Sequence, residues 1–128
     1  MEAVSEVMAR DLVRIAPDVT LTDAARAMAA RRVGSALVFE GDRLVGIVTE
    51  RDILRAVAEG RLGETAGEAM TPQPETIAAS DPIEHAGVLM LHGGFRHLPV
   101  TEGGEVVGVV SIRDLVGHAL QDAAPRGV

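Results

Sequence analysis

Residues 45–52 read Val-Gly-Ile-Val-Thr-Glu-Arg-Asp, and residues 107–114 read Val-Gly-Val-Val-Ser-Ile-Arg-Asp. Sliding the chain by 62 residues, the offset between these stretches, aligns 4–58 with 66–120 without a gap. Further identical pairs include Glu6/Glu68, Met8/Met70, Ile15/Ile77, Ala24/Ala86, Met28/Met90, Val38/Val100 and Gly41/Gly103. A unit of this length in two copies is unlike solenoid arrays, whose repeats span about 20–50 residues. The sequence therefore predicts two related subdomains that bury their apolar faces on each other with pseudo-twofold symmetry.

Each copy predicts the same elements, in the order β-α-β-β-α after a short helical opening. In the first copy we expect the opening at 4–8, an extended piece at 13–15, a helix from 21, a hairpin at 36–39 and 44–48, and a helix from 49. In the second copy we expect the opening at 66–70, an extended piece at 75–77, a helix from 83, a hairpin at 97–101 and 106–110, and a helix from 111. The fold class is α/β (α+β). The expected boundaries are 1–60 for the first repeat, 61–65 for a linker, 66–121 for the second repeat and 122–128 for a flexible tail.

Local signals support the helix starts and the hairpins. Asp81 is expected to cap the helix that follows, with Pro82 at its first position, and Thr20 offers a similar cap in the first copy. The central Gly41-Asp42 and Gly103-Gly104 are expected to supply the positive φ angles of tight hairpin turns.

The composition excludes several classes of function. The net charge is −7 and all cationic side chains are arginines, so binding to nucleic acid through phosphate neutralisation is not expected. Without cysteine there are no disulfides, thiolate nucleophiles or cysteine metal sites. The acidic N-terminus lacks the apolar core of a signal peptide, and no apolar stretch is long enough to span a membrane. These features indicate a soluble cytoplasmic protein with no membrane partner.

The repeated Gly-x-x-Thr/Ser-x-Arg-Asp motif carries the chemistry. It places Thr49 and Asp52, and likewise Ser111 and Asp114, three residues apart at a helix start. Such a carboxylate can accept hydrogen bonds from both hydroxyls of a ribose, while the first-turn amides favour an anion. The same spacing is also a capping box with no ligand. The arginine in each first turn opposes the helix dipole, which an anion or an acidic neighbour would explain.

The doubled unit, the motif and the stretch Phe95-Arg96-His97-Leu98-Pro99-Val100 together resemble a tandem pair of CBS domains, also called a Bateman module. The resemblance covers roughly residues 3–121. It implies adenosine-containing ligands in two clefts between the repeats, with AMP, ADP or ATP expected before S-adenosylmethionine or NAD, and no required cofactor. It further implies a homodimer that regulates an effector protein, unidentified here.

By position, the resemblance implies that Asp52 and Asp114 hold the ribose and that backbone near Ile15 and Ile77 meets adenine. Arg96 or His97 would meet phosphate. The full set of implied nucleotide-binding positions is Arg14, Ile15, Ser35, Thr49, Arg51, Asp52, Thr76, Ile77, Arg96, His97, Pro99, Ser111, Arg113 and Asp114. The first copy departs from the pattern, because 34–37 reads Gly-Ser-Ala-Leu where 96–99 reads Arg-His-Leu-Pro. We therefore expect unequal clefts, with tighter phosphate binding beside Ser111 and Asp114.

Metal and enzyme functions have little support in the sequence. The histidines, at 85, 92, 97 and 118, lack the i,i+4 spacing of a helical metal site. No P-loop, Gly-x-Ser-x-Gly or His-Glu-x-x-His motif is present. The methionines at 8, 28, 70 and 90 are interpreted as core residues. We expect neither a metal site nor catalysis.

Two functions remain. The first is a stand-alone adenine-nucleotide sensor that acts in trans, because no effector domain is present in the chain. The alternative is a dimeric interaction scaffold whose motifs are only helix caps. The helix at 23–30 is small and apolar on more than one face. That composition fits a second buried contact, between copies or across a dimer, and fits equally well a simple tolerance for alanine in helices.

Overall fold

The computed structural model describes residues 2–123, the last two of these by their backbone alone. The chain divides into two compact units. One unit is formed by Asp11–Pro74, and the other combines the chain up to Arg10 with the chain from Glu75 onward. Among the described helices, none has the length and apolar character that crossing a membrane requires.

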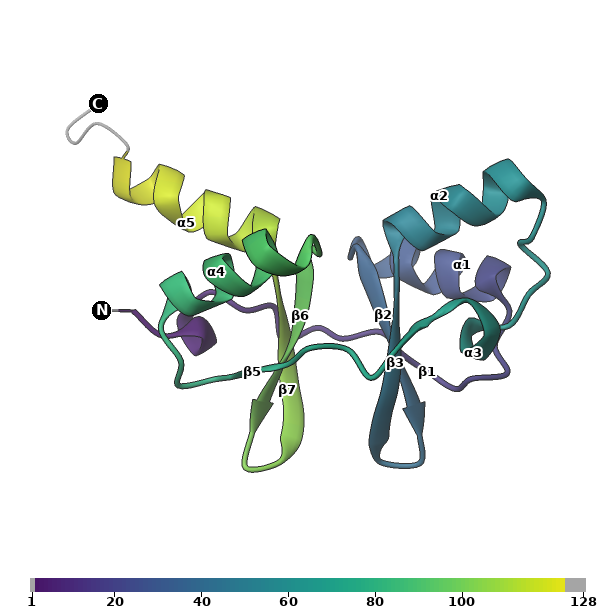
Figure 1. Cartoon of the computed structure of the whole chain (residues 1–128), viewed down its shortest axis with the longest axis horizontal. Coiled ribbons are helices and arrows are strands. Elements are labelled where there is room, and N and C mark those ends of the chain that lie inside the picture. Colours follow the sequence, from purple (N-terminus) through teal and green to yellow (C-terminus); the bar gives the residue numbers. More distant parts are fainter. Residues whose placement is uncertain (1, 124–128) are drawn as a thin grey trace. The chain divides into compact units, whose positions relative to one another are not determined.

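The unit formed by Asp11–Pro74 contains a four-stranded sheet covered by helices. Its elements are β1 (Arg14–Ile15), α1 (Leu21–Arg31), β2 (Ser35–Glu40), β3 (Arg43–Thr49), α2 (Glu50–Glu59), α3 (Ala66–Ala69) and β4 (Thr71–Pro72). The strand order is β1-β2-β3-β4, with β1 parallel to β2 and the other pairs antiparallel. Helices α1 and α2 contact each other and the central hairpin (Figure 1).

The other unit has the same plan. Its elements are η1 (Val4–Glu6), a single turn of 3-10 helix, followed by β5 (Ile77–Ala78), α4 (Ile83–Gly93), β6 (His97–Glu102), β7 (Glu105–Ser111) and α5 (Ile112–Ala123). The strand order is β5-β6-β7, and β5 is parallel to β6. Each unit therefore realises the β-α-β-β-α order that the repeat predicts.

The opening segment of each repeat lies in the unit built from the other repeat. Ala9 and Val109 exchange backbone hydrogen bonds, with N···O distances of 2.8 and 2.9 Å. In the other unit, Thr71 of β4 pairs with Ile47 of β3 at the equivalent register. The compact units thus differ from the sequence repeats by one opening segment each, because a repeat identifies segments that are alike and not segments that pack together.

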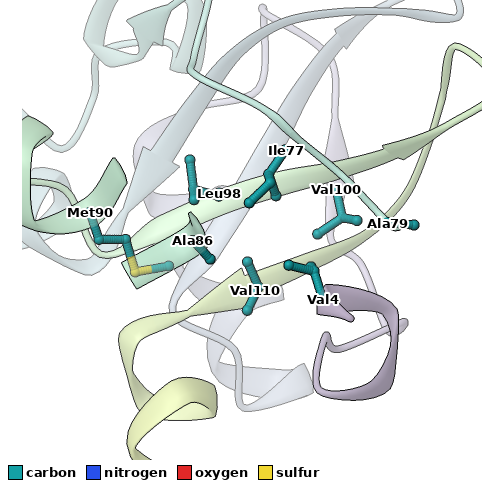
Figure 2. Close-up of a cluster of buried hydrophobic side chains, with 8 residues drawn as sticks. All are labelled: Val4, Ile77, Ala79, Ala86, Met90, Leu98, Val100 and Val110. Carbon is teal, nitrogen blue, oxygen red and sulfur yellow. The ribbon is translucent and has the colours of Figure 1, made fainter. Parts of the chain in front are cut away.

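Each unit has its own hydrophobic core, and the exchanged segment contributes to it. Figure 2 shows the core of the β5-β6-β7 unit, which comprises Val4, Ile77, Ala79, Ala86, Met90, Leu98, Val100 and Val110. Val4 of the opening segment is completely buried there. In the β1-β2-β3-β4 unit, Ala66 occupies the equivalent place, packed with Leu21, Val38 and Val48. Burial of these side chains supplies most of the driving force for folding.

Several local expectations are confirmed. Both hairpins form, the helices begin after Thr49 and Ser111, and the Thr20 hydroxyl caps α1 by accepting a hydrogen bond from the Asp23 amide at 3.2 Å. Met28 and Met90 are buried in the cores. Met8 and Met70 are half-buried; Met8 packs against the cluster that contains Met90, and Met70 packs against the cluster of Leu21, Val38 and Val48.

The expected cap at Asp81 is wrong. Pro82 is the N-cap residue of α4, with an extended backbone, and Ile83 is the first helical residue. The bridge between Ala3 and Pro82 holds this backbone extended, and the Ile83 amide donates to the Glu2 carbonyl. The Asp81 carboxylate instead accepts a hydrogen bond from the Ala78 amide at 3.2 Å.

Smaller expectations also differ from the structure. In the first hairpin turn only Gly41 has a positive φ, whereas Asp42 does not; in the second turn both glycines do. Strand β5 covers 77–78 instead of 75–77. Helix α5 continues through Ala123, so the first two residues of the expected tail 122–128 are helical, and 124–128 lie outside the described residues.

The short helix α3 is capped by Glu68, which makes the stability of this opening segment depend on pH. Its carboxylate accepts hydrogen bonds from the Thr65 amide at 3.0 Å and hydroxyl at 2.9 Å, and these bonds lower the pKa of Glu68. A lowered folded-state pKa stabilises the fold above the ordinary glutamate range, and this stabilisation is lost as the pH falls through the lowered pKa. We therefore expect Glu68→Gln to destabilise the protein at neutral pH, and the difference from wild type to vanish in acid.

Denaturant unfolding measured across this pH range checks the expectation. Glu84→Gln is the matched control, since Glu84 is an exposed first-turn glutamate of α4. An effect of Glu68→Gln that persists unchanged in acid would contradict the carboxylate's role.

Candidate functional site

The start of α2 lies beside the first residue of β2. Ser35 of β2 is the register partner of Thr49, the last residue of β3 and the N-cap of α2. The Asp52 carboxylate accepts hydrogen bonds through Oδ2 from the Thr49 amide at 2.8 Å and from its hydroxyl at 3.1 Å. The Glu50 amide donates to the Gly34 carbonyl at 3.0 Å. This backbone hydrogen bond holds the start of α2 against the residue that precedes β2.

The start of α5 repeats this arrangement with one difference in the hydroxyl. His97 of β6 is the register partner of Ser111, whose amide donates to Asp114 Oδ2 at 2.8 Å. The Ser111 hydroxyl accepts a hydrogen bond from the Asp114 amide at 3.2 Å, whereas the Thr49 hydroxyl donates to a carboxylate. The Ile112 amide donates to the Arg96 carbonyl at 2.9 Å. The structure therefore brings Arg96, His97, Ser111 and Asp114 together at one helix start.

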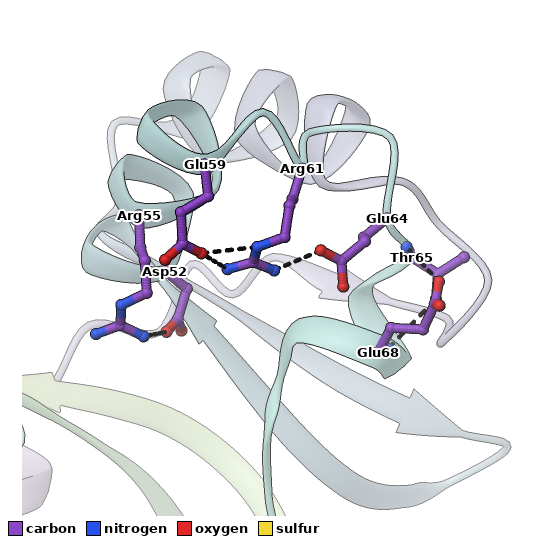
Figure 3. A network of polar contacts seen from close by, with 7 residues as sticks. All are labelled: Asp52, Arg55, Glu59, Arg61, Glu64, Thr65 and Glu68. Atoms are coloured by element: carbon purple, nitrogen blue, oxygen red, sulfur yellow. Dashed lines mark hydrogen bonds and ion pairs between the residues drawn. The ribbon is translucent and has the colours of Figure 1, made fainter.

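The two carboxylates also differ in their ionic partners. Arg55 Nη1 lies 3.7 Å from Asp52 Oδ1, one turn further along α2 (Figure 3). The residue that aligns with Arg55 in the second repeat is Gly117. Within the described part of the chain, Asp114 makes no ion pair. Its Oδ1 atom is also outside the capping hydrogen bonds.

The first-turn arginines, Arg51 and Arg113, have exposed side chains and no ion pair within residues 2–123. No ion pair among the described residues therefore offsets the cost that the helix dipole imposes on these cations, although acidic residues share the first turn of each helix. Arg96 is likewise exposed at the start of α5. Arg14 is different, because its guanidinium lies 3.9 Å from the centre of the Phe39 ring in a cation–π contact.

The remaining expected site residues lie at the sheet edges or in the core. Thr76 is exposed and directly precedes β5, and Ile15 is half-buried in β1. Ile77 is 2% exposed and belongs to the hydrophobic core, and the side chain of Pro99 is completely buried. Ser35 is the buried polar residue of its unit. Any ligand contact from Ile77 has to come from its backbone, as the resemblance implies.

Two of the histidines lie close to single carboxylates. His85 Nδ1 is 3.4 Å from Asp81 Oδ2, and His118 Nε2 is 3.4 Å from Glu2 Oε2. No group of three or more histidine, aspartate or glutamate side chains able to hold a metal ion occurs in the described part of the chain.

Reasoning from the sequence missed two features of the site. The first is the hydrogen bond that the first amide of each helix donates, to the Gly34 carbonyl at α2 and to the Arg96 carbonyl at α5. These bonds join backbone groups, so no residue type in the sequence indicates them. The Arg55–Asp52 ion pair was also missed, although the aligned repeats show an arginine and a glycine three residues after the two aspartates. That difference was the available signal.

The chain belongs to the CBS domain family, whose model matches residues 4–59 and 66–120. The expected tandem pair of CBS domains is therefore confirmed. An uncharacterised 17.7 kDa protein of Acidianus ambivalens is 36% identical over 121 residues, which are 93% of this chain and 73% of that protein. The CBS domain-containing protein YhcV of Bacillus subtilis is 33% identical over 124 residues, 95% of this chain and 89% of that protein. The match to CBSCBSPB2 of Arabidopsis thaliana, 38% identical over 115 residues and 84% of this chain, spans only 22% of that protein.

Solved structures share the fold. A CBS-domain protein of Agrobacterium tumefaciens has a TM-score of 0.85 and 31% identity, covering 92% of this chain and 99% of its own. A CBS domain protein of Pyrobaculum aerophilum, solved in complex with AMP, has a TM-score of 0.84 and 35% identity, covering 95% and 98% of the two chains. The α/β fold expected from the sequence is confirmed by these likenesses.

Proposed function

We propose that the chain is a regulatory module that binds an adenosine-containing ligand of the AMP, ADP or ATP class at the starts of α2 and α5. The observation that carries the proposal is the half-buried Asp114 carboxylate. Its Oδ2 atom accepts the capping hydrogen bond from the Ser111 amide, and its Oδ1 atom has no ion pair among the described residues. The AMP complex of the Pyrobaculum relative supports the choice of ligand class.

Each part of the ligand has a proposed partner. Asp114 Oδ1 accepts hydrogen bonds from the ribose hydroxyls. Such hydrogen bonds are strong because the acceptor is charged. The first-turn amides of α5 and the Arg96 and Arg113 guanidinium groups attract phosphate. Backbone at Thr76 and Ile77 meets the adenine edge. At α2, the corresponding groups are Asp52, Arg51 and the backbone of β1.

The response to ligand is proposed to pass to a separate effector protein in the cytoplasm through a homodimer, without catalysis. YhcV supports action in trans, because the matched region makes up 89% of it. A homodimer is supported by large apolar side chains that are exposed on the helices. They are Leu54, Val57, Val88, Leu91, Ile112, Val116 and Leu120. For ligand to change the module's state, it must bind one arrangement more tightly than the other.

Thermal unfolding with and without AMP, ADP and ATP tests the proposal. Circular dichroism is the suitable signal, since the chain has no tryptophan or tyrosine. A ligand at about 100 times its Kd stabilises the fold by about 2.7 kcal/mol, which raises the Tm by several degrees. We expect Asp114→Asn to bind at least about tenfold more weakly, because a charged acceptor is lost. Its Tm without ligand should stay close to that of wild type, because asparagine can still cap the helix.

An interaction scaffold without a ligand is the second candidate. It is favoured by the two hydrogen bonds that the Thr49 amide and hydroxyl donate to the Asp52 carboxylate, because these give Asp52 a role as a helix cap without any ligand. No Tm change with millimolar AMP, ADP or ATP would support the scaffold and overturn the proposed nucleotide sensor.

A further inference from the structure

Asp52 and Asp114 occupy equivalent positions, but their carboxylates are engaged to different extents. Asp52 Oδ2 accepts two hydrogen bonds from Thr49, and Asp52 Oδ1 faces the Arg55 guanidinium at 3.7 Å (Figure 3). Asp114 Oδ2 accepts one hydrogen bond from the Ser111 amide. Both oxygens of Asp52 therefore have partners within the chain, whereas one oxygen of Asp114 has none among the described residues.

The difference is built into the sequence of the two helices. Arg55 lies three residues after Asp52, on the same face of α2, where oppositely charged side chains attract. The equivalent residue of α5, Gly117, has no side chain, and a Cβ at this position would meet nothing within 4 Å. The Asp52 side chain is 15% exposed, and the Arg55 side chain is 55% exposed. An arginine at 117 would have room to make the same ion pair.

We propose that Arg55 determines the order in which the two sites fill, by competing with a ribose for the Asp52 carboxylate. This inference rests on the proposed function. A ligand at α2 has to displace the guanidinium from Oδ1 before its hydroxyls can bind, and a ligand at α5 does not. The site at Asp114 therefore fills first, and the site at Asp52 fills only at higher nucleotide concentration. The Arg55–Asp52 ion pair thus separates the affinities of the two sites for one ligand.

Isothermal titration with AMP tests this order. The Asp114→Asn variant leaves the α2 site to be measured, and adding Arg55→Ala to it should tighten AMP binding about two- to fivefold, the value of a partly exposed ion pair. The Asp52→Asn variant leaves the α5 site, and adding Gly117→Arg to it should weaken binding by a similar factor. In the otherwise wild-type chain, Asp114→Asn should weaken the tighter binding event and Asp52→Asn the weaker one.

Two control variants separate the ion pair from other effects. Gly117→Ala changes helix propensity without adding charge, and Arg26→Ala removes the arginine of an exposed ion pair on α1, where Arg26 lies 3.4 Å from Asp23. Neither should change AMP affinity. Unchanged affinity on Arg55→Ala, in a chain that does bind AMP, would overturn this inference and leave the proposed function intact. Weaker binding on Arg55→Ala would also overturn it, since Arg55 would then be a ligand contact. Absence of AMP binding in wild type would overturn the proposed function itself.

Discussion

Replacing Val4 by aspartate is expected to destabilise the protein by at least about 3 kcal/mol, because it places an unpaired charge in a completely buried position. The loss should fall on the unit built from the second repeat, although Val4 belongs to the first. Val4 packs there with Leu98, Val100 and Val110 (Figure 2). Hydrogen exchange should therefore show the greatest loss of protection in β6 and β7 and a smaller loss in β2 and β3.

A control in the same segment isolates burial from charge. Ala9→Asp adds the same charge at an exposed side chain and should cost far less. Val4→Ala should lie between the two, at about 2 kcal/mol, since it removes buried methyl groups and leaves a small cavity. Loss of protection centred on β2 and β3 in Val4→Asp would contradict the exchange of opening segments.

Local signals were enough to predict most of the elements. Glycine at 41, 103 and 104 indicated where the hairpins turn, and the hydroxyl–carboxylate pairs indicated where α2 and α5 begin. These features depend on interactions within a few residues, so a single stretch of sequence contains all the information. The expectation at Asp81 failed because the backbone of Pro82 is held by the distant Ala3, which no local pattern reveals.

The exchange of opening segments could not be read from the repeat. The segments at 4–8 and 66–70 share their glutamate and methionine, so by pattern either could pack on either sheet. Each segment is placed by backbone hydrogen bonds to residues far away in the sequence, as in the pairing of Ala9 with Val109. The candidate site shows the same division. The capping contacts of Asp52 and Asp114 follow from spacing, whereas the contact with Arg55 depends on how its long side chain is placed.

Exchange also explains why both repeats keep a glycine in the strand before the last helix, and it predicts unequal costs for filling them. A Cβ at Gly46 would lie 2.7 Å from Met70 Cγ and 3.0 Å from Met70 Cβ, so its nearest neighbours belong to that side chain. A Cβ at Gly108 would lie 2.6 Å from Met8 Sδ and 2.8 Å from the carbonyl oxygen of Ala9. We expect Gly108→Ala to cost about 2–3 kcal/mol and Gly46→Ala about 1 kcal/mol, because a methionine can move aside more easily than a paired backbone.

Double-mutant cycles measured by denaturant unfolding distinguish the two causes. Met70→Ala should recover much of the loss caused by Gly46→Ala, since it removes the two atoms nearest to the new methyl group and leaves only the Cβ of residue 70, at 3.0 Å, among its three nearest neighbours. Met8→Ala should recover little of the loss caused by Gly108→Ala, because the Ala9 carbonyl remains and its hydrogen bond with the Val109 amide is still displaced. Equal rescue in both units would mean that crowding by the methionine side chains is the only reason that Gly46 and Gly108 do not tolerate a Cβ. Unequal rescue would mean that at Gly108 the obstacle is the backbone of the exchanged segment, a constraint that only glycine satisfies.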